Sequence, residues 1–264
     1  MMESIAEIAG IDVELLKPHI KAVHQKHGTS EYAFLLEELQ PVIAPGRTVA
    51  QLMDMFAPAV AVFRENRRKH LALYPTVAET LLKVRGAGAV LIGYTESMGF
   101  YSNYRVRRLG LDGVFHEIFS PQDHDIPRNM TREQIRKYPA AHYELKFTKH
   151  SHTPTGSLKP DAAVLQAIVD KVGGAPEECV YVGDSLFKDV PMAQQVGVAD
   201  VWAKYGEARH KAEYTLLREV THWTAADVQR ESKLKAHHVN PSITLHQSFS
   251  ELLTFFRFGD AHAG

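Results

Sequence analysis

Two acidic residues, five positions apart, follow a short apolar run in the second half of the chain. The run VYV at 180–182 leads into Gly183, and Asp184 and Asp189 come after it. β-Branched and aromatic residues before a glycine predict a buried strand that ends in a tight turn. Carboxylate oxygens are the ligands that Mg²⁺ prefers in proteins. Asp184 and Asp189 are therefore candidate ligands of a divalent metal such as Mg²⁺ where this strand ends, an interpretation that depends on the other residues at the same edge.

A hydroxyl and a cation stand at the ends of two other predicted elements. Thr95 closes the apolar run LIGYT, and Lys159 precedes the helical pattern KPDAAVLQAIV. Taken singly, Thr95 is an ordinary strand-end residue, Lys159 a surface lysine, and Asp189 a first-turn acid that complements a helix dipole. Taken together they suit a bound phosphate, because Thr95 and Lys159 can hold phosphoryl oxygens while the acids hold the metal.

The elements that must position these residues alternate between strands and helices. Apolar runs predict strands at 89–95, 114–119, 179–183, 199–203 and 243–245. Helical patterns occur at 75–84, 98–109, 160–172, 186–196 and 249–256. Such alternation predicts the α/β class, with a Rossmann-like, doubly wound parallel sheet. Right-handed crossovers then place the strand ends at one edge of the sheet, which is where ligands bind.

Residues 1–73 carry helical patterns only, in three amphipathic stretches, with Pro58 at a kink or break in the third. We therefore expect two domains: an all-helical one at 1–73 and an α/β core at 74–264. One segment of the core, at about 121–155, does not follow the alternation. It contains one alternating run, YELKFT, and we interpret it as a β-flap or loop excursion.

In their order, these motifs resemble those of the haloacid dehalogenase-like (HAD) superfamily. LIGYT matches the family's second motif at Thr95, and LKPD matches its third at Lys159. GDSLFKD matches the fourth motif at Asp184 and Asp189. Each motif alone is weak, and the resemblance depends on the ordered set.

The resemblance covers roughly residues 74–264, and the helical residues 1–73 resemble the family's inserted cap. It implies a Mg²⁺-dependent phosphatase that acts on a small phosphate ester through an aspartyl-phosphate intermediate. Asp184 would be the direct metal ligand, and Asp189 would orient a metal-bound water or the lysine. The cap would exclude water and select the substrate.

The family's first motif, an apolar strand followed by Asp-x-Asp, has no counterpart in this chain. The segment DVE at 12–14 follows helical sequence, and the segment DHD at 123–125 comes after the second motif, so neither is a credible substitute. We therefore expect the nucleophile in a missing N-terminal segment. The alternative is a non-catalytic HAD-like protein that binds phosphate or metal or interacts with another protein.

Charge and composition limit which partners and which cellular compartment we expect. The 30 Lys and Arg against 31 Asp and Glu leave a net charge of −1, so no global field favours nucleic acid or an anionic membrane. The one cysteine, Cys179, excludes an internal disulfide and suits a reducing compartment. No secretory signal or membrane-length apolar run is present, so we expect a soluble cytoplasmic protein. The histidine pairs at 150/152 and 237/238 have no cysteine or cluster of acidic residues at metal-ligand spacing. We therefore expect them to be exposed loop residues and not a metal site.

Overall fold

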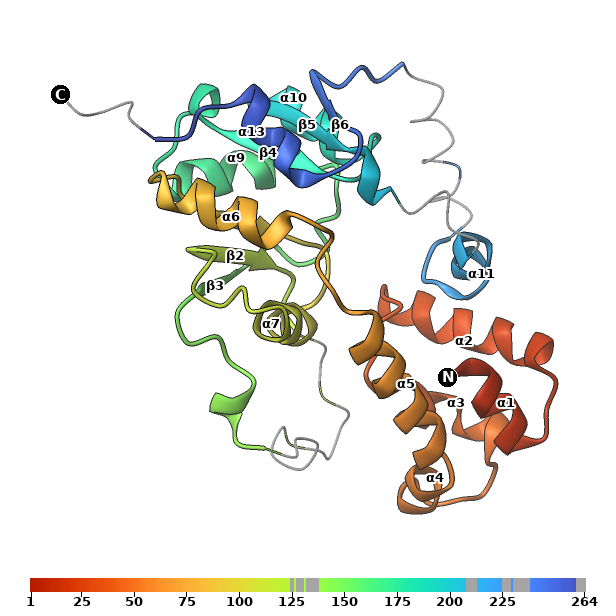
Figure 1. Ribbon diagram of the computed structural model, residues 1–264. Coiled ribbons are helices and arrows are strands. Elements are labelled where there is room, and N and C mark those ends of the chain that lie inside the picture. The colour runs from red at the N-terminus through yellow and green to blue at the C-terminus, as the bar shows by residue number, and fades with distance from the viewer. Residues whose placement is uncertain are drawn as a thin grey trace. The chain divides into compact units, whose positions relative to one another are not determined.

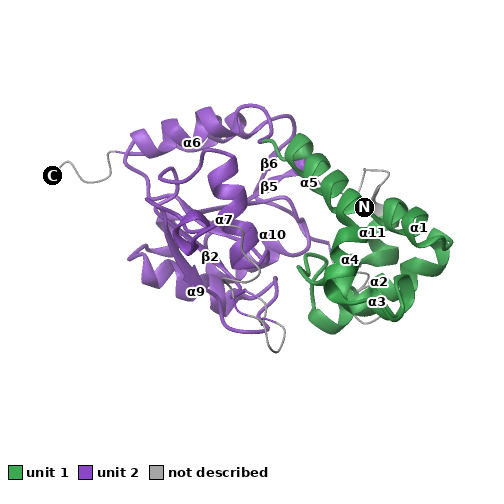
Figure 2. Ribbon diagram, turned by 90° about the horizontal axis from the view of Figure 1, so that it is seen from below, with its two compact units in different colours: residues 1–72, 208–233 green, residues 73–207, 234–264 purple. Residues whose placement is uncertain are grey.

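The computed structural model describes residues 1–123, 126, 131, 138–207, 213–224, 229 and 238–259 (Figure 1). Among these residues, no helix has both the length and the apolar character to cross a membrane. The chain divides into two compact units, which Figure 2 colours separately: unit 1 is 1–72 with 208–233, and unit 2 is 73–207 with 234–264. The sequence pattern places residues 208–233 with the core, whereas the structure groups them with the helices.

Unit 1 is helical in all of its described elements. Its helices are α1 (Met2–Ala9), α2 (Val13–His27), α3 (Leu35–Ile43), α4 (Val49–Met55), α5 (Ala57–His70) and α11 (Glu213–Val220). Pro58 marks a break, because it lies in the first turn of α5, where its missing N–H costs nothing. The apolar faces of the helices meet in one core around Ile5, Leu16 and Phe56, which are fully buried.

Helix α11 comes from late in the chain and packs against α2 within unit 1. Val220 packs against the unit 1 core, and the buried His24 donates from Nδ1 to the Val220 carbonyl. Lys17 pairs with Glu219 at 2.8 Å. Burial lowers the pKa of His24, so its ring is neutral at pH 7 and donates a single N–H. These contacts explain why α11 groups with the helices of unit 1.

Unit 2 alternates strands with helices, which confirms the predicted α/β class. Its strands are β1 (Ile92–Tyr94), β2 (Glu117–Ser120), β3 (Lys149–His152), β4 (Val180–Gly183), β5 (Ala199–Ala203) and β6 (Ile243–Leu245). Its α-helices are α6 (Val77–Gly86), α7 (Gly99–Arg108), α9 (Ala162–Lys171), α10 (Asp189–Val196) and α13 (Leu252–Phe255). Short 3₁₀ turns are η1 (Ala140–His142), η2 (Pro176–Glu178), η3 (Lys204–Gly206) and η5 (Phe249–Glu251).

The strands form two three-stranded parallel sheets, β1-β2-β3 and β4-β5-β6. Consecutive side chains of β2 point to opposite faces, so Ile118 packs with α6 and Phe119 packs with α9. Figure 2 shows α6 and α9 on opposite sides of the strands. Tyr94 of β1 and Tyr181 of β4 pack on one cluster with Leu165 of α9. Helix α9 therefore covers part of both sheets.

Strands β1 and β4 each have one edge that pairs with no other strand in the described part of the chain. Ladder bonds alternate along a parallel strand, so the backbone groups of Ile92 and Tyr94 face away from β2. For the same reason those of Val180 and Val182 face away from β5. Every residue of β1 and β4 is partly exposed, whereas β2 is buried throughout. Such open edges invite pairing with a further strand.

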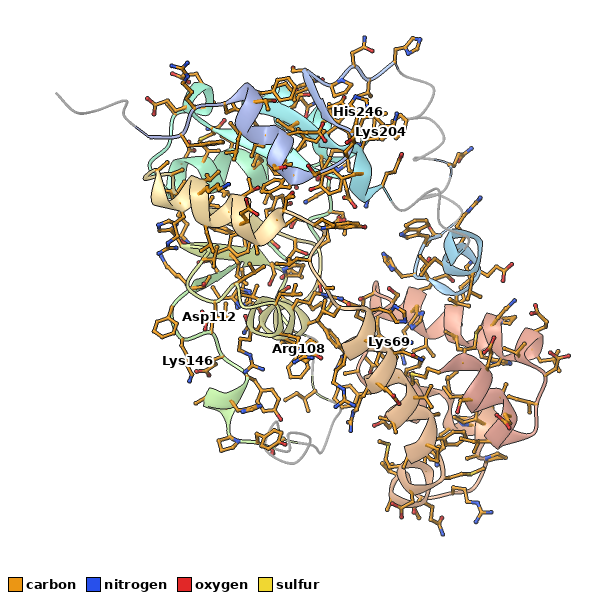
Figure 3. All side chains as sticks on the ribbon, viewed as in Figure 1. Lys69, Arg108, Asp112, Lys146, Lys204 and His246 are labelled. Atoms are coloured by element: carbon orange, nitrogen blue, oxygen red, sulfur yellow. The ribbon has the colours of Figure 1, made fainter. Side chains whose placement is uncertain are left out.

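The segment at 121–155 lies partly outside the described residues. Its alternating run at 143–148 is not a strand, because Asp112 holds part of it in a loop. The Asp112 carboxylate accepts the backbone N–H groups of residues 146, 147 and 148 at 2.8 to 3.1 Å. Figure 3 shows Asp112 beside Lys146. The chain then joins the sheet as β3, parallel to β2, so this end of the predicted excursion is part of the sheet.

Candidate active site

Unit 2 brings the four residues singled out in the sequence to the same edge of its strands. Thr95 follows β1, Lys159 precedes α9, Asp184 follows β4 and Asp189 begins α10. The Lys159 Nζ lies 3.1 Å from Asp189 Oδ1 and 3.2 Å from the carbonyl oxygen of Tyr94, which precedes Thr95. Its charge is also close enough to act on Asp184. Lys159 therefore links the three segments.

Lys159 and Asp189 form a nearly buried ion pair, with side chains that are 13% and 6% exposed. The Lys159 Nζ also lies over two aromatic rings, 4.5 Å from the centroid of Tyr94 and 5.4 Å from that of Tyr181. Ring faces attract a cation and compensate part of the hydration that burial removes. These contacts hold a long and otherwise flexible side chain in one position.

Three donors engage the two oxygens of Asp189. Lys159 and the Tyr181 hydroxyl donate to Oδ1, the hydroxyl at 3.0 Å, and the Ser185 amide donates to Oδ2 at 3.0 Å. Burial, and then the negative charge of Asp189, raises the pKa of Tyr181 well above its usual value, so the hydroxyl keeps the proton that it donates. With both oxygens engaged, Asp189 is better arranged to orient Lys159 than to bind a metal directly.

Gly183 leaves room for Asp189. A Cβ at position 183 would lie 2.3 Å from Asp189 Cγ and 2.4 Å from its Oδ2. Gly183 and Tyr181 are two residues apart in β4 and therefore share the face on which the Asp189 carboxylate lies. The glycine is needed here because the acid folds back over the end of the strand.

Asp184 differs from Asp189 in being exposed. Within the described part of the chain, no other residue donates a hydrogen bond to its carboxylate, while its backbone carbonyl accepts one from Trp202 Nε1 at 3.2 Å. The protein packed around Asp184, and then the negative charge of Asp189, raises the pKa of its carboxyl group. A nearby cation would favour the ionised form again, so this position suits a divalent metal.

The donor set is compatible with Mg²⁺. In proteins this ion is held by one or two carboxylates, and water and phosphate oxygens complete its coordination. Asp184 offers one accessible carboxylate of this kind. No group of three His, Cys, Asp or Glu side chains that could hold a metal ion occurs among the residues that the structure describes. Asp184 therefore fits a metal ion that takes one protein carboxylate and completes its coordination from other sources.

Thr95 presents its hydroxyl at the end of β1. Its Oγ1 accepts the backbone N–H of Ser97 at 3.1 Å, and its own amide donates to the Phe119 carbonyl at 3.0 Å. These bonds fix the turn after β1. Because Oγ1 acts as the acceptor toward Ser97, its proton can be donated to a phosphoryl oxygen.

Three further residues complete the site, although the motif spacing does not single them out: Tyr94, Tyr181 and Glu96. Tyr181 could have been found, because it precedes Gly183 by two positions in a strand and must share its face. Glu96 accepts a hydrogen bond from the Lys159 amide at 2.8 Å. The sequence signal for Glu96 is its position directly after Thr95.

The two acidic segments that were rejected as candidate nucleophiles have structural roles. Asp12 is the N-cap of α2, and its carboxylate accepts the Glu14 amide at 2.8 Å. Asp123 accepts the amide of Phe100 in the first turn of α7. Residues 124 and 125 of that segment lie outside the described residues. Both described acids are therefore engaged at helix starts.

The histidine pairs agree with the expectation of exposed loops only in part. His150 and His152 lie in strand β3, with ring centroids 4.9 Å apart, so the loop is wrong for both, although His152 is exposed as expected. The Nε2 of His150 lies 2.7 Å from the Ser120 hydroxyl, and burial lowers the pKa of the His150 ring. His238 is exposed and outside any helix or strand, and His237 lies outside the described residues.

Comparison with known proteins finds a matching family and curated relatives. A family model described as haloacid dehalogenase-like hydrolase matches residues 3–197. A curated relative, the glyceraldehyde 3-phosphate phosphatase of Methanopyrus kandleri, is 26% identical over 153 residues, which are 58% of this chain and 52% of the relative. The chain thus spans about half the length of that relative.

Further similarities were found to a second relative and to solved structures. The glyceraldehyde 3-phosphate phosphatase of Pyrococcus furiosus is 36% identical over 52 residues, which are 20% of this chain and 22% of that protein. A HAD phosphatase structure from Thermococcus onnurineus has 14% identity and a TM-score of 0.49, covering 98% of this chain and 87% of the other. A haloacid dehalogenase-like family hydrolase from Xanthomonas campestris has 13% identity and a TM-score of 0.44, covering 87% and 84%.

Proposed function

The chain belongs to the haloacid dehalogenase-like hydrolase family, and from that premise we propose that it acts as a Mg²⁺-dependent phosphatase on a small phosphate ester. The observation that carries the proposal is the Lys159–Asp189 ion pair with the accessible Asp184 close to it. A lysine held in one position near an accessible carboxylate suits a phosphate and its metal ion. The names of two relatives, both glyceraldehyde 3-phosphate phosphatases, support a phosphoric ester as the substrate.

Each residue of the site has a role toward the phosphoryl group in this proposal. Lys159 neutralises charge on the phosphoryl oxygens, and Thr95 donates its hydroxyl proton to one of them. Asp189 keeps Lys159 in place. Asp184 would hold Mg²⁺, which supplies further neutralisation of the phosphoryl oxygens when bound. Phosphoryl transfer depends mainly on such positioning and charge stabilisation.

The open edges of β1 and β4 support a nucleophile from outside residues 1–264. One parallel strand between them could pair with the outward backbone groups of Ile92, Val180 and Val182 and with the amide of Tyr94, whose carbonyl already accepts from Lys159. It would end at the same edge as its neighbours, so its last residue would lie near Lys159. We propose that this strand precedes residue 1 and carries Asp-x-Asp. The first Asp would form the aspartyl-phosphate, and the second would transfer the proton to the leaving group.

Unit 1 would serve as the cap that selects the substrate. A cap suits a small phosphate ester better than a phosphoprotein, because it must enclose what it selects. Glyceraldehyde 3-phosphate is the first ester to test, since both curated relatives are named for it. The expectation of a soluble, cytoplasmic protein stays a prediction, which cell fractionation would test.

Phosphate release from glyceraldehyde 3-phosphate and from p-nitrophenyl phosphate, by protein purified from its native source, tests this function. Release is expected with Mg²⁺ and not with EDTA. In the extended chain that carries Asp-x-Asp, Asp184→Asn is expected to abolish turnover. Asp170→Asn is the matched control, because Asp170 is an exposed acid of α9 that binds Gln166, and it should leave turnover unchanged. Turnover of Asp184→Asn at the wild-type rate would refute the assignment. The intact mass and N-terminal peptide of the same preparation test for the Asp-x-Asp segment.

A non-catalytic protein that binds phosphate or a metal ion is the second candidate. It is favoured by the observation that Lys159, Asp184 and Asp189 assemble within residues 1–264, where the described Asp12 and Asp123 are engaged at helix starts. It predicts that this chain binds inorganic phosphate and unfolds cooperatively. It also predicts that protein from the native source hydrolyses neither ester.

A further inference from the structure

One carboxylate contacts all three segments that form the site. Glu96 directly follows Thr95 at the end of β1. Its Oε1 accepts the backbone N–H of Lys159 at 2.8 Å, and its Oε2 lies 3.1 Å from the Lys188 Nζ. Lys188 is the residue before Asp189, at the start of α10. Glu96 therefore joins the turn after β1 to the segment before α9 and to the start of α10.

Lys159 is held at both ends of its side chain. At the tip, the Nζ donates to Asp189 and to the Tyr94 carbonyl. At the base, the Lys159 amide donates to Glu96. A lysine side chain is flexible and loses much rotamer freedom when it is held in place. Fixing the backbone as well as the tip determines how far the ammonium group reaches from the strand edge.

The Glu96–Lys188 pair contributes little to overall stability. Its side chains are 29% and 40% exposed, and water screens ion pairs that are this accessible. The pair differs from Glu79–Lys83, which is 65% and 60% exposed and connects only one turn of α6. Glu96 connects three separate segments, so its loss should change their positions more than the stability of the fold.

We propose that Glu96 is a positioning residue that sets the placement of Lys159 at the phosphate site. This inference rests on the proposed function, because it takes Lys159 to be the group that binds phosphoryl oxygens. Glu96 acts through the Lys159 backbone, and Lys188 holds the Glu96 carboxylate in the required orientation. Sites of this kind need their groups within about 0.5 Å of the productive position, so a loosened backbone weakens the grip on phosphate.

Lysine labelling tests the positioning directly and needs no phosphate. The full chain is treated with acetic anhydride, and the rate of Lys159 modification is measured by peptide mass spectrometry. We expect slow modification in the wild type and about tenfold faster modification in Glu96→Ala, because the loosened segment opens more often. Glu96→Gln keeps an oxygen that accepts the Lys159 N–H and should stay near the wild-type rate. Glu79→Ala, which removes an exposed glutamate from another lysine pair, should change nothing.

Titration calorimetry with inorganic phosphate and Mg²⁺ relates this placement to binding. We expect Glu96→Ala to bind inorganic phosphate about tenfold more weakly and Glu96→Gln less than about threefold more weakly. The thermal midpoint of Glu96→Ala should stay close to that of the wild type. In a Lys159→Met background, adding Glu96→Ala should cause no further loss of affinity, because the group that Glu96 positions is then absent.

Equal labelling rates of Lys159 in the wild type and in Glu96→Ala would overturn the proposal, whatever the phosphate result. Faster labelling with unchanged phosphate affinity would also overturn it, because the placement of Lys159 would then not govern binding. If the wild type binds no inorganic phosphate while labelling changes as expected, the contact of Glu96 with Lys159 is supported and the phosphate site of the proposed function is refuted.

Discussion

Replacing Gly183 with alanine should destabilise unit 2 through one ion pair. The added Cβ would lie 2.3 Å from Asp189 Cγ, whereas carbon atoms in contact are normally about 3.5 to 4.0 Å apart. Asp189 must therefore retreat by about 1 Å or more. It would then lose its bonds to Lys159 and to the Tyr181 hydroxyl. Breaking a buried pair costs about 3–5 kcal/mol, and overpacking adds to this, so we expect a loss of at least about 3 kcal/mol.

Urea unfolding followed by circular dichroism measures this loss. With an m value of about 2–3 kcal/mol per molar urea, a loss of about 3 kcal/mol lowers the midpoint by about 1 M. Gly86→Ala is the matched control, because Gly86 is the last residue of α6 and an added Cβ there meets no atom within 4 Å. Its expected effect is neutral or stabilising by up to about 1 kcal/mol, since alanine favours the helix.

An unfolding free energy of Gly183→Ala within about 0.5 kcal/mol of the wild type would refute the reasoning. A double-mutant cycle with Lys159→Met tests the cause. When the ion pair is already absent, the alanine should cost at least about 1 kcal/mol less than it does in the wild type. Equal costs in both backgrounds would mean that the alanine acts elsewhere than on the Lys159–Asp189 pair.

Three further predictions concern other contacts. Tyr181→Phe removes the hydroxyl that donates to Asp189, so it should lower the unfolding free energy by about 1.5–3 kcal/mol. The same urea assay measures this loss, and an unchanged midpoint would contradict the role of the hydroxyl. Burial lowers the pKa of His24 in the folded protein below the ordinary value of 6.5. As the pH falls, the unfolded chain therefore takes up the proton first. The stability contributed by a neutral His24 is complete above pH 6.5 and declines below it. Thermal melts at about pH 7.5 and 5.5 should show a smaller decline in His24→Asn than in the wild type. Asp112→Ala removes the acceptor of three backbone N–H groups, so hydrogen exchange at residues 146–148 should become faster while exchange in β5 stays the same.

The strands were predictable where burial demands apolar residues. Strands β5 and β6 have the bounds that their apolar runs predict. The start of α9 was less predictable, because it depends on which side chain accepts a free N–H. Asp161 caps the helix by accepting the Val164 amide at 3.2 Å, so the helix begins at Ala162, two residues after the predicted start at Pro160.

Features that depend on distant partners were not predictable from local pattern. Strand β3 has the sequence KHSH, with no apolar residue, and it is a strand because β2 pairs with it. The buried Glu117 of β2 supports this pairing, since it lies 3.5 Å from the Lys149 Nζ and accepts a hydrogen bond from Ser151. Helix α11 belongs to unit 1 through a contact between Val220 and His24, which lie 196 positions apart.

The order of the motifs was sufficient to bring the four candidate residues to one edge, because parallel strands end together. The spacing of Asp184 and Asp189 along the sequence does not show that their surroundings in the fold differ. Asp189 is buried among Lys159, Tyr181 and Ser185, whereas Asp184 is exposed. The sequence indicates a tight turn at Gly183, whereas the structure shows that the glycine also leaves room for the Asp189 carboxylate.

The membership of α11 in unit 1 has a consequence for synthesis of the chain on the ribosome. Helix α5 ends at residue 70, and α11 begins only at residue 213, after most of unit 2. At about 5–20 residues per second, roughly 7 to 30 s pass between the two. Until then α2 lacks the partner that Val220 and its neighbours provide. Strand β6 of unit 2 emerges later still, so neither unit can be completed before the other has begun. Their co-translational folding must therefore be interleaved.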